Sequence, residues 1–244
     1  MNTQSNSYTF IYASVIVLIV ASILAVMATA LKPAQEKNIE IEKKENILTS
    51  LRITSTRSDA EKLYDKYIVD KYALNSEGEK VSQVDPFTIN LREELKKPRD
   101  KRILPVFNAE KNDTVFLVIP VYGKGLWGPI WGYISLEPEK YTNPKGTEST
   151  RYREIYGAFF DHKAETPGLG AEIATPGFQK QFRGKSIIDA YGKFLGIKVA
   201  KGGGNPEAPN EVDAISGGTI TSKGVQAMLD TCLISYKDYL ITQY

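Results

Sequence analysis

The chain has few residues of the kinds that bind metals or form disulfides: one cysteine, Cys232, and one histidine, His162, in 244 residues. A lone cysteine excludes a disulfide within the chain, and one cysteine with one histidine makes a zinc site improbable. A dinucleotide-binding fingerprint is also missing. The run Gly202-Gly203-Gly204 lacks the lysine and hydroxyl residue of a phosphate-binding P-loop, so we interpret it as a flexible link.

Charged residues are absent from the first 31 positions, so all 31 basic and 29 acidic residues lie within residues 32–244. This larger part is nearly neutral and has no broad basic face, and nucleic acid is therefore not an expected partner. Its length suffices for one large domain, or for one domain with an extension.

The uncharged run from Phe10 to Leu31 is long enough to cross a membrane, because a helix rising about 1.5 Å per residue spans the roughly 30 Å hydrocarbon core. Ala28-Thr29-Ala30 has the form of a signal-peptidase site, but no basic residue precedes the run, which is long for a signal peptide. We predict an uncleaved anchor over residues 10–31 behind a tail of residues 1–9. Charge alone does not fix its orientation, because Lys32 and Lys37 are mixed with glutamates.

Residues 32–100 begin with a charged, helical pattern, which favours a stalk or extension between the anchor and a domain over residues 101–244. Within it, the segment from Asp59 to Tyr72 is predicted as a second helix. Covering helices of the same domain are an equally good interpretation.

Strand signals dominate after Ile103, so the predicted fold is α+β: one N-terminal transmembrane helix, then a mostly antiparallel sheet with packed helices. A turn at Gly123-Lys124-Gly125 separates two β-rich runs, and Pro120 in the first run predicts an edge or an irregularity. The predicted strands are 114–122, 127–136, 155–161, 186–189 and 195–200.

The segment from Asp213 to Ser222 places two glycines between hydroxyl residues, directly before an amphipathic helical pattern. Thr221 or Ser222 is a suitable N-cap for that helix, which leaves Thr219 just outside the first turn. A phosphate near Thr219 would meet the positive end of the helix dipole and several unpaired N–H groups. A capped turn without a ligand has the same composition. Cys232, on the apolar face of this helix, is predicted to pack as a small hydrophobic residue.

The same segment resembles the flavinylation motif of proteins that carry FMN as a phosphoester on a threonine. The residues that match are Asp213, Ser216, Gly217, Gly218 and Thr219. Gly218 replaces the usual alanine, a small-for-small change that bears on the efficiency of modification. The resemblance implies covalent FMN on Thr219, which serves as a tether, and an external flavin transferase that makes the bond.

Two further segments, 122–133 and 165–172, are similar to other signatures of the same FMN-binding family. The three blocks lie in the expected order behind one N-terminal anchor. The whole arrangement resembles the C-subunit family of sodium-translocating NADH:quinone oxidoreductases, and is related to the flavin-carrying G subunit of Rnf electron-transport complexes.

The loop from Glu165 to Gly170 is the predicted site of the flavin ring. The glycines Gly168 and Gly170 permit close approach, Leu169 can pack on an apolar ring, and Thr166 can bond a polar ring edge. Three other residues belong to the predicted cofactor site: Lys185, Ile220 and Thr221.

Several of these side chains have a second interpretation. Lys185 either places positive charge near a reduced flavin or is a solvated lysine. Trp127 and Trp131 either contact flavin or, more commonly for hairpin aromatics, belong to the core or an interface. His162 is either a proton-transfer group or, more commonly, a structural or surface histidine.

The resemblance implies a flavoprotein that relays electrons inside a complex coupling NADH oxidation and quinone reduction to sodium export. Expected partners are the other subunits, especially the FMN-bearing B subunit and the D and E membrane subunits. The implied location is the bacterial inner membrane, single-pass, with the FMN domain on the periplasmic side. Two alternatives are the Rnf-type subunit, with another electron donor, and an anchored flavin-binding sensor or scaffold.

Overall fold

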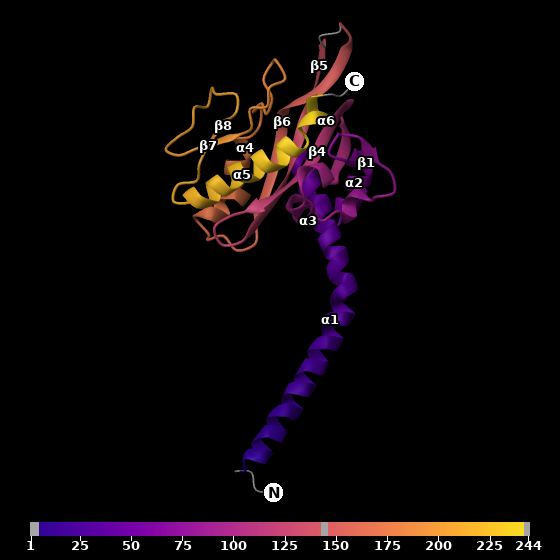
Figure 1. Cartoon of the computed structure of the whole chain (residues 1–244), viewed down its shortest axis with the longest axis vertical. Helices are drawn as coiled ribbons and strands as arrows, with labels where there is room; N and C mark the ends of the chain where they lie inside the picture. Colours follow the sequence, from indigo (N-terminus) through magenta and orange to yellow (C-terminus); the bar gives the residue numbers. More distant parts are fainter. Residues whose placement is uncertain (1–4, 143–145, 242–244) are drawn as a thin grey trace. The chain divides into compact units, whose positions relative to one another are not determined.

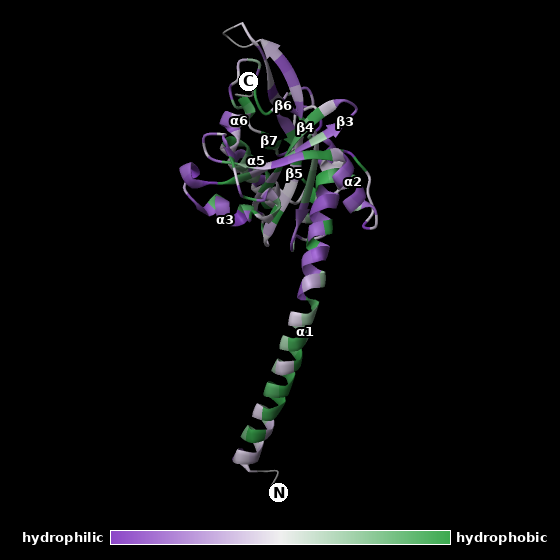
Figure 2. Cartoon of the chain, turned by 90° about the vertical axis from the view of Figure 1, so that its right-hand side faces the viewer, coloured by the Kyte–Doolittle hydropathy of each residue, from purple (hydrophilic) through white to green (hydrophobic). Residues whose placement is uncertain are grey.

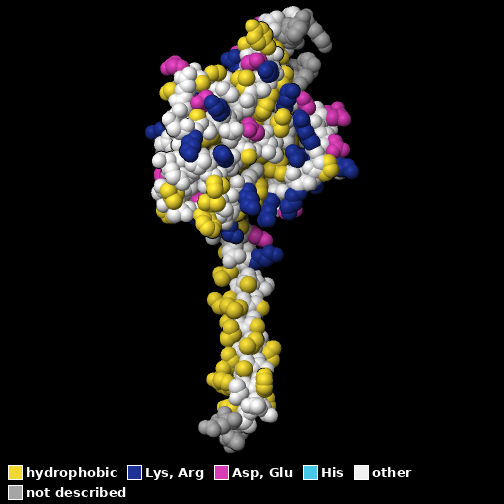
Figure 3. All heavy atoms as spheres, turned by 60° about the vertical axis from the view of Figure 1, so that its left-hand side comes forward, with side chains coloured by type: hydrophobic (Ala, Val, Ile, Leu, Met, Phe, Trp, Pro, Cys, Tyr) yellow, Lys and Arg dark blue, Asp and Glu magenta, His cyan; other side chains and the backbone are white. Residues whose placement is uncertain are grey.

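The computed structural model describes residues 5–142 and 146–241, and the chain divides into two compact units, Met1–Lys43 and Lys44–Tyr244. Helix α1, Asn6–Ser50, supplies the first unit, and its last turns belong to the second. Within the described residues, α1 is the one helix long and apolar enough to cross a membrane. Figure 2 shows hydrophobic residues along its N-terminal part, and Figure 3 shows apolar side chains there. The predicted helix over residues 10–31 is thus part of a longer one.

A six-stranded antiparallel sheet forms the centre of the second unit, in the order β2-β1-β3-β4-β5-β6. Strands β3 to β6 are neighbours in both sequence and space, so that part of the sheet is a meander of hairpins (Figure 1). The predicted α+β fold with a mostly antiparallel sheet is confirmed. The strands are β1 Ile68–Leu74, β2 Lys80–Val81, β3 Leu104–Lys111, β4 Thr114–Lys124, β5 Pro129–Thr142 and β6 Glu148–His162.

Short helices surround this sheet, and one longer helix, α5 Thr219–Ser235, packs against β4 (Figure 1). A separate pair of parallel strands, β7 Lys198–Ala200 and β8 Glu211–Asp213, lies outside the large sheet. The other helices are α2 Ala60–Tyr67, α3 Leu91–Lys96, α4 Pro176–Lys180 and α6 Lys237–Ile241, with 3₁₀ turns η1 Pro86–Thr88, η2 Arg99–Lys101 and η3 Gly170–Ala174.

Side-chain alternation along β4 sends residues into two separate cores. Leu117 and Ile119 pack in a core that also contains the buried side chains of α5. Phe116 and Val118 pack on the opposite face with Leu48 at the C-terminal end of α1. Both faces of the sheet are therefore covered, one by α5 and the other by the last turns of α1 together with α2.

The boundary between the two units, at residues 43 and 44, differs from the boundary predicted at residue 101. Residues 44–100 contribute α2, α3, β1 and β2 to the unit that contains the sheet. The predicted helix from Asp59 to Tyr72 is wrong in its second half, where β1 begins at Ile68. Pairing with β3, for example Tyr72 with Val106, decides this conformation, because tertiary context overrides local helical periodicity.

Two other strand predictions differ from the structure. The segment 186–189 makes only isolated bridges, and the segment 195–200 contributes the three residues of β7 to the small parallel pair. Strand β4 lies inside the sheet although it contains Pro120. The last pair between β3 and β4 is Phe107 with Val118, so Pro120 lies beyond the β3 ladder and pairs only with Tyr133 of β5.

The hairpin between β4 and β5 turns later than predicted. Its loop is residues 125–128, closed by a hydrogen bond from the Gly125 N–H to the Gly128 carbonyl of 2.8 Å. Trp127 therefore lies at the tip of a loop and is exposed, whereas the prediction placed it in a strand. We call residues 125–128 the hairpin loop.

Cys232 lies on the buried face of α5 and packs in the core, as predicted for a small hydrophobic residue. Its thiol donates to the Tyr122 carbonyl, and burial raises the pKa of this thiol to about 12. The thiol therefore stays protonated at neutral pH and is a poor nucleophile.

Candidate functional site

Helix α5 begins at Thr219, with Gly218 as its N-cap and no side chain capping the first turn. The predicted caps are wrong because both hydroxyls have other partners. Ser222 Oγ accepts the Ile215 N–H at 3.0 Å, and Thr221 Oγ1 donates to Glu165 Oε2 at 2.5 Å. The N–H groups of the first turn therefore point out beside Thr219 without a side-chain acceptor, as an anion site requires.

Two glycines shape the approach to this helix start. Gly217 has φ +73°, a conformation that favours glycine, and a Cβ there would lie 2.6 Å from Leu169 Cδ2, so the end of the Leu169 side chain would have to shift. Gly218 has an ordinary φ of −100°, but a Cβ would lie 2.8 Å from Ile215 Cγ2. The Ile215 side chain occupies the space that an alanine methyl group at residue 218 would need, which accounts for glycine at this position.

A cavity of about 230 Å³ lies beside Thr219. Its walls come from three segments far apart in the sequence: the hairpin loop, the loop 165–170 and the start of α5. Four of its residues are large apolar side chains with high exposed fractions: Leu126 46%, Trp127 67%, Leu169 42% and Ile220 57%. Exposed apolar side chains gathered around a small cavity are typical of a site for a flat apolar ligand. The lining residues are Leu126, Trp127, Glu165, Thr166, Leu169, Gly170, Gly217, Gly218, Thr219, Ile220 and Thr221.

Glu165 joins the three walls of this cavity. Its carboxylate is buried, and it accepts the Trp127 N–H at Oε1 (2.8 Å) and the Thr221 hydroxyl at Oε2 (2.5 Å). The Glu165 N–H donates to His162 Nδ1 at 3.2 Å, which gives His162 a structural contact. Gly125 leaves room for the carboxylate, since a Cβ there would lie 2.5 Å from Oε1. We call Glu165 with Trp127 and Thr221 the Glu165 clamp.

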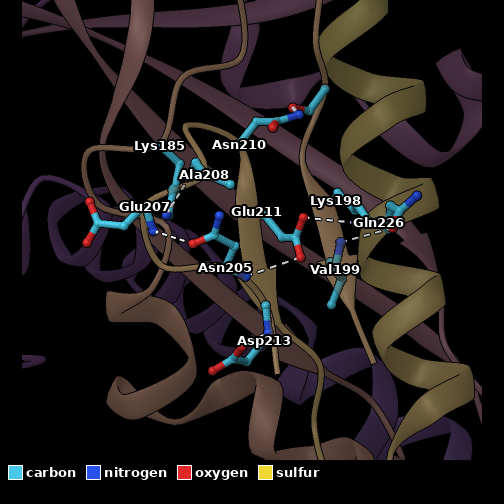
Figure 4. Close-up of polar contacts among 12 residues, drawn as sticks. Lys185, Lys198, Val199, Asn205, Glu207, Ala208, Asn210, Glu211, Asp213 and Gln226 are labelled. Carbon is cyan, nitrogen blue, oxygen red and sulfur yellow. Dashed lines mark hydrogen bonds and ion pairs between the residues drawn. The ribbon is translucent and has the colours of Figure 1, made fainter. Parts of the chain in front are cut away.

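Four predicted site residues do not line this cavity: Gly168, Lys185, Asp213 and Ser216. Lys185 and Asp213 line a different cavity of about 330 Å³. The Lys185 amine donates to the carbonyls of Pro206 and Ala208, both at 2.8 Å, and Figure 4 shows Lys185 beside Ala208. The Asp213 carboxylate accepts the Gly204 N–H. These contacts show that Lys185 and Asp213 hold the loop between β7 and β8.

The remaining contacts in Figure 4 hold this loop to β8 and hold β7 to α5. Lys198 pairs with Glu211 at 2.9 Å, and Glu211 also accepts the Asn205 N–H at 3.2 Å. The Val199 N–H donates to Gln226 of α5 at 2.9 Å. The loop residues 205–208, which follow Gly202-Gly203-Gly204, are therefore held at several points.

Sequence reasoning missed Leu126, and it favoured a core or interface place for Trp127. The sequence does contain a pattern that predicts their exposure: Gly125 and Gly128 flank these two apolar residues, and a pair of glycines so spaced is typical of a tight loop. Apolar residues at the tip of a hairpin loop are exposed unless a ligand or another chain covers them.

The FMN-binding domain family matches residues 125–234, a range that contains all three walls of the cavity. The C subunit of the Na(+)-translocating NADH-quinone reductase of Neisseria meningitidis serogroup A is 32% identical over 241 residues, which cover 91% of this chain and 88% of that protein. The chain belongs to this C-subunit family. The Pseudomonas aeruginosa member is 30% identical over 251 residues, covering 93% of this chain and 91% of its own.

A solved member of the family has the same fold. The crystal structure of the C subunit from Parabacteroides distasonis superposes with a TM-score of 0.76 at 37% identity, over 88% of this chain and 98% of that chain. The cofactor that the family domain implies is FMN, and two observations on this chain fit it. The cavity has the exposed apolar lining that a flat ring requires, and the helix start without a side-chain cap suits a phosphate.

Replacing Gly217 with alanine should destabilise the protein more than the same change at Gly168. Both glycines have φ +73°, so alanine at either position costs about 1 kcal/mol or more in backbone strain. Only at Gly217 would the new Cβ also press on Leu169, whereas nothing lies within 4 Å of the Gly168 position. Thermal unfolding of the detergent-solubilised chain should therefore show a drop for both variants that is somewhat larger for Gly217→Ala, and equal drops would contradict the packing argument.

Proposed function

We propose that FMN is joined through its phosphate to the Thr219 hydroxyl, and that the chain relays electrons within a Na⁺-translocating NADH-quinone reductase. The observation that carries this proposal is the place of Thr219. It is the first residue of a helix without a side-chain cap, and it lies on the wall of the cavity lined by exposed apolar side chains.

The residues around Thr219 have separate tasks in this proposal. The first-turn N–H groups of α5 and its dipole offset the phosphate charge. Leu169 and Trp127 offer apolar surfaces on two different walls to the ring, and Thr166 offers a hydroxyl to a polar ring edge. The Glu165 clamp holds these walls at a fixed separation. Bound FMN supplies one- and two-electron chemistry, and the chain holds, orients and shields it.

The wider assignment follows from family membership. Relatives from Neisseria meningitidis and Pseudomonas aeruginosa are named as subunits of the sodium-translocating complex, which favours that complex over the Rnf alternative. The proposed partners are the B, D and E subunits, with an external flavin transferase for maturation. Helix α1 would anchor the chain in the bacterial inner membrane, with the flavin domain on the periplasmic side. The NADH, quinone and sodium sites would belong to the partners.

Peptide mapping tests the attachment directly. The full chain is produced in a host that has its own flavin transferase, denatured, and examined by in-gel flavin fluorescence and intact mass. We expect an addition of the mass of FMN, less water, confined to the peptide that contains Thr219. An unmodified mass from a competent host would reject covalent attachment, and a modified peptide elsewhere would reject Thr219.

A further inference from the structure

A larger cavity of about 720 Å³ borders the hairpin loop at Gly128. Its apolar part includes Leu95, Tyr122, Pro129 and Met228, and its charged part is entirely basic. We call it the basic groove. It is lined by Arg92, Leu95, Lys96, Tyr122, Gly123, Lys124, Gly128, Pro129, Lys163, Gly224, Ala227, Met228 and Thr231.

The charge of the basic groove departs from that of the whole chain. The chain has 31 basic and 29 acidic residues, but the groove has four basic residues and no acidic one. Lys96 pairs with Glu93 at 2.8 Å. Arg92, Lys124 and Lys163 are exposed, and none of them is within ion-pair distance of a carboxylate in residues 5–142 and 146–241. The charge of Arg92 also acts on the neighbouring Glu93 carboxylate, so Lys124 and Lys163 are the main cations of the groove. Together with the apolar floor they form a surface suited to an anionic, partly apolar partner.

The basic groove and the proposed flavin cavity share the hairpin loop as a wall. Lys124, Gly128 and Pro129 line the groove, whereas Leu126 and Trp127, between them in sequence, line the flavin cavity. Lys163 of the groove lies two residues before Glu165 of the clamp. Helix α5 also packs closely against the end of β4, because a Cβ on Gly224 would lie 2.5 Å from the Lys124 carbonyl oxygen. A molecule in the groove would thus contact the loop whose other residues line the flavin cavity.

We propose that the basic groove docks an acidic protein segment, with an apolar side chain, from the subunit that exchanges electrons with this chain. Carboxylates of that segment pair with Arg92, Lys124 and Lys163, while its apolar side chain lies on Leu95 and Met228. Charge complementarity speeds association and fixes orientation, and electron-transfer partners commonly use such small surfaces. Docking makes and breaks no covalent bond, and each electron that one carrier gives up is taken by the other.

This inference rests on the proposed function for the neighbouring flavin, but carbodiimide cross-linking tests docking independently. The reagent joins a lysine amine to a carboxylate in direct contact, and it is applied to the whole complex in mild detergent. We expect Lys124 or Lys163 to be joined to an aspartate or glutamate of another subunit, less so at high salt. The same product is expected from the Thr219→Ala complex, which should carry no covalent flavin.

Matched lysines provide the control for cross-linking. Lys180 and Lys193 are also exposed, and neither lines the groove nor has a carboxylate partner among the described residues. They should not be joined to the same segment. If other lysines of the complex cross-link between subunits while Lys124 and Lys163 do not, the docking proposal is overturned, whatever the state of Thr219.

Charge reversal gives a kinetic test on the same complex. Lys124→Glu with Lys163→Glu is compared with Lys180→Glu and Lys193→Glu, which change the net charge equally. After NADH is added at low ionic strength, flavin reduction by stopped flow should be about tenfold slower in the groove variant, with flavin content unchanged. Added salt should slow the wild type towards the variant. Equal rates in both double variants would overturn the proposal.

Two further outcomes have defined meanings. If the groove variant does not assemble or does not receive flavin, the milder Lys124→Gln with Lys163→Gln variant replaces it. Its rate should be lower than those of the wild type and of a matched Lys180→Gln with Lys193→Gln variant, and equal rates would overturn the proposal. If the wild type shows the same slow rate after its anionic lipids are exchanged for zwitterionic ones, the groove binds a lipid headgroup, and the docking proposal fails.

Discussion

The Thr219→Ala variant is expected to fold normally and to carry no covalent flavin. Thr219 is the half-buried first residue of α5, and no described residue receives a hydrogen bond from its side chain. Alanine is a strong helix former, so the change should alter the free energy of unfolding by no more than about 0.5 kcal/mol. In-gel fluorescence and intact mass measure the flavin, and thermal unfolding measures the fold.

A neighbouring hydroxyl serves as the control for this variant. Thr221→Ala should keep at least part of the flavin, because the Thr221 hydroxyl is bonded to Glu165 and lies after the attachment position. Covalent flavin that persists in a folded Thr219→Ala protein would end the assignment.

The Glu165→Ala variant is expected to lose the most stability among changes around the cavity. It leaves the Thr221 hydroxyl and the Trp127 N–H without their acceptor, and it empties a buried position. Unsatisfied buried polar groups together with a void cost about 2–4 kcal/mol. In a domain of this size such a loss lowers the unfolding temperature by roughly 5–10 °C. Covalent flavin should fall as well, because the three walls are no longer held together.

Glu172 is the matched control for Glu165. It lies in the same loop region and is half-buried, and its carboxylate accepts one hydrogen bond, from the exposed Gly168 N–H at 3.2 Å. Glu172→Ala should therefore cost about 1 kcal/mol or less. The unfolding temperatures of the Glu165→Ala and Glu172→Ala variants measure the two losses of stability. Equal losses would show that the Glu165 clamp has no special part in assembling the cavity.

Much of the fold could be predicted from local patterns. The apolar run at residues 10–31 and the alternating hairpin strands are local signals, and both correspond to elements of the structure. The segment after Tyr67 could not be predicted in this way. Its residues fit a helical period, and only the pairing of β1 with β3, more than thirty residues later in the chain, makes it a strand.

In the candidate site, too, some parts could be predicted from local sequence and others depend on contacts between distant segments. The segment around Thr219 and the loop 165–170 are each one continuous stretch of sequence, so each could be predicted as part of the site. The structure brings both to one cavity. The exposure of Trp127 depends on where the hairpin turns, and the place of Lys185 depends on the loop that it holds. The basic groove gathers residues from α3, β4, β5 and α5, and no single stretch of sequence contains its pattern.

The strand order also bears on when the flavin cavity can form as the chain folds. Strands β3 to β6 pair with sequence neighbours, and such short-range contacts close quickly and at low entropic cost. The cavity needs a contact of much longer range, because Thr221 of α5 must reach Glu165 across 56 positions of the chain. We expect the sheet to be in place before α5 docks, so Thr219 and the rest of the helix start would be the last part of the site to reach their native position.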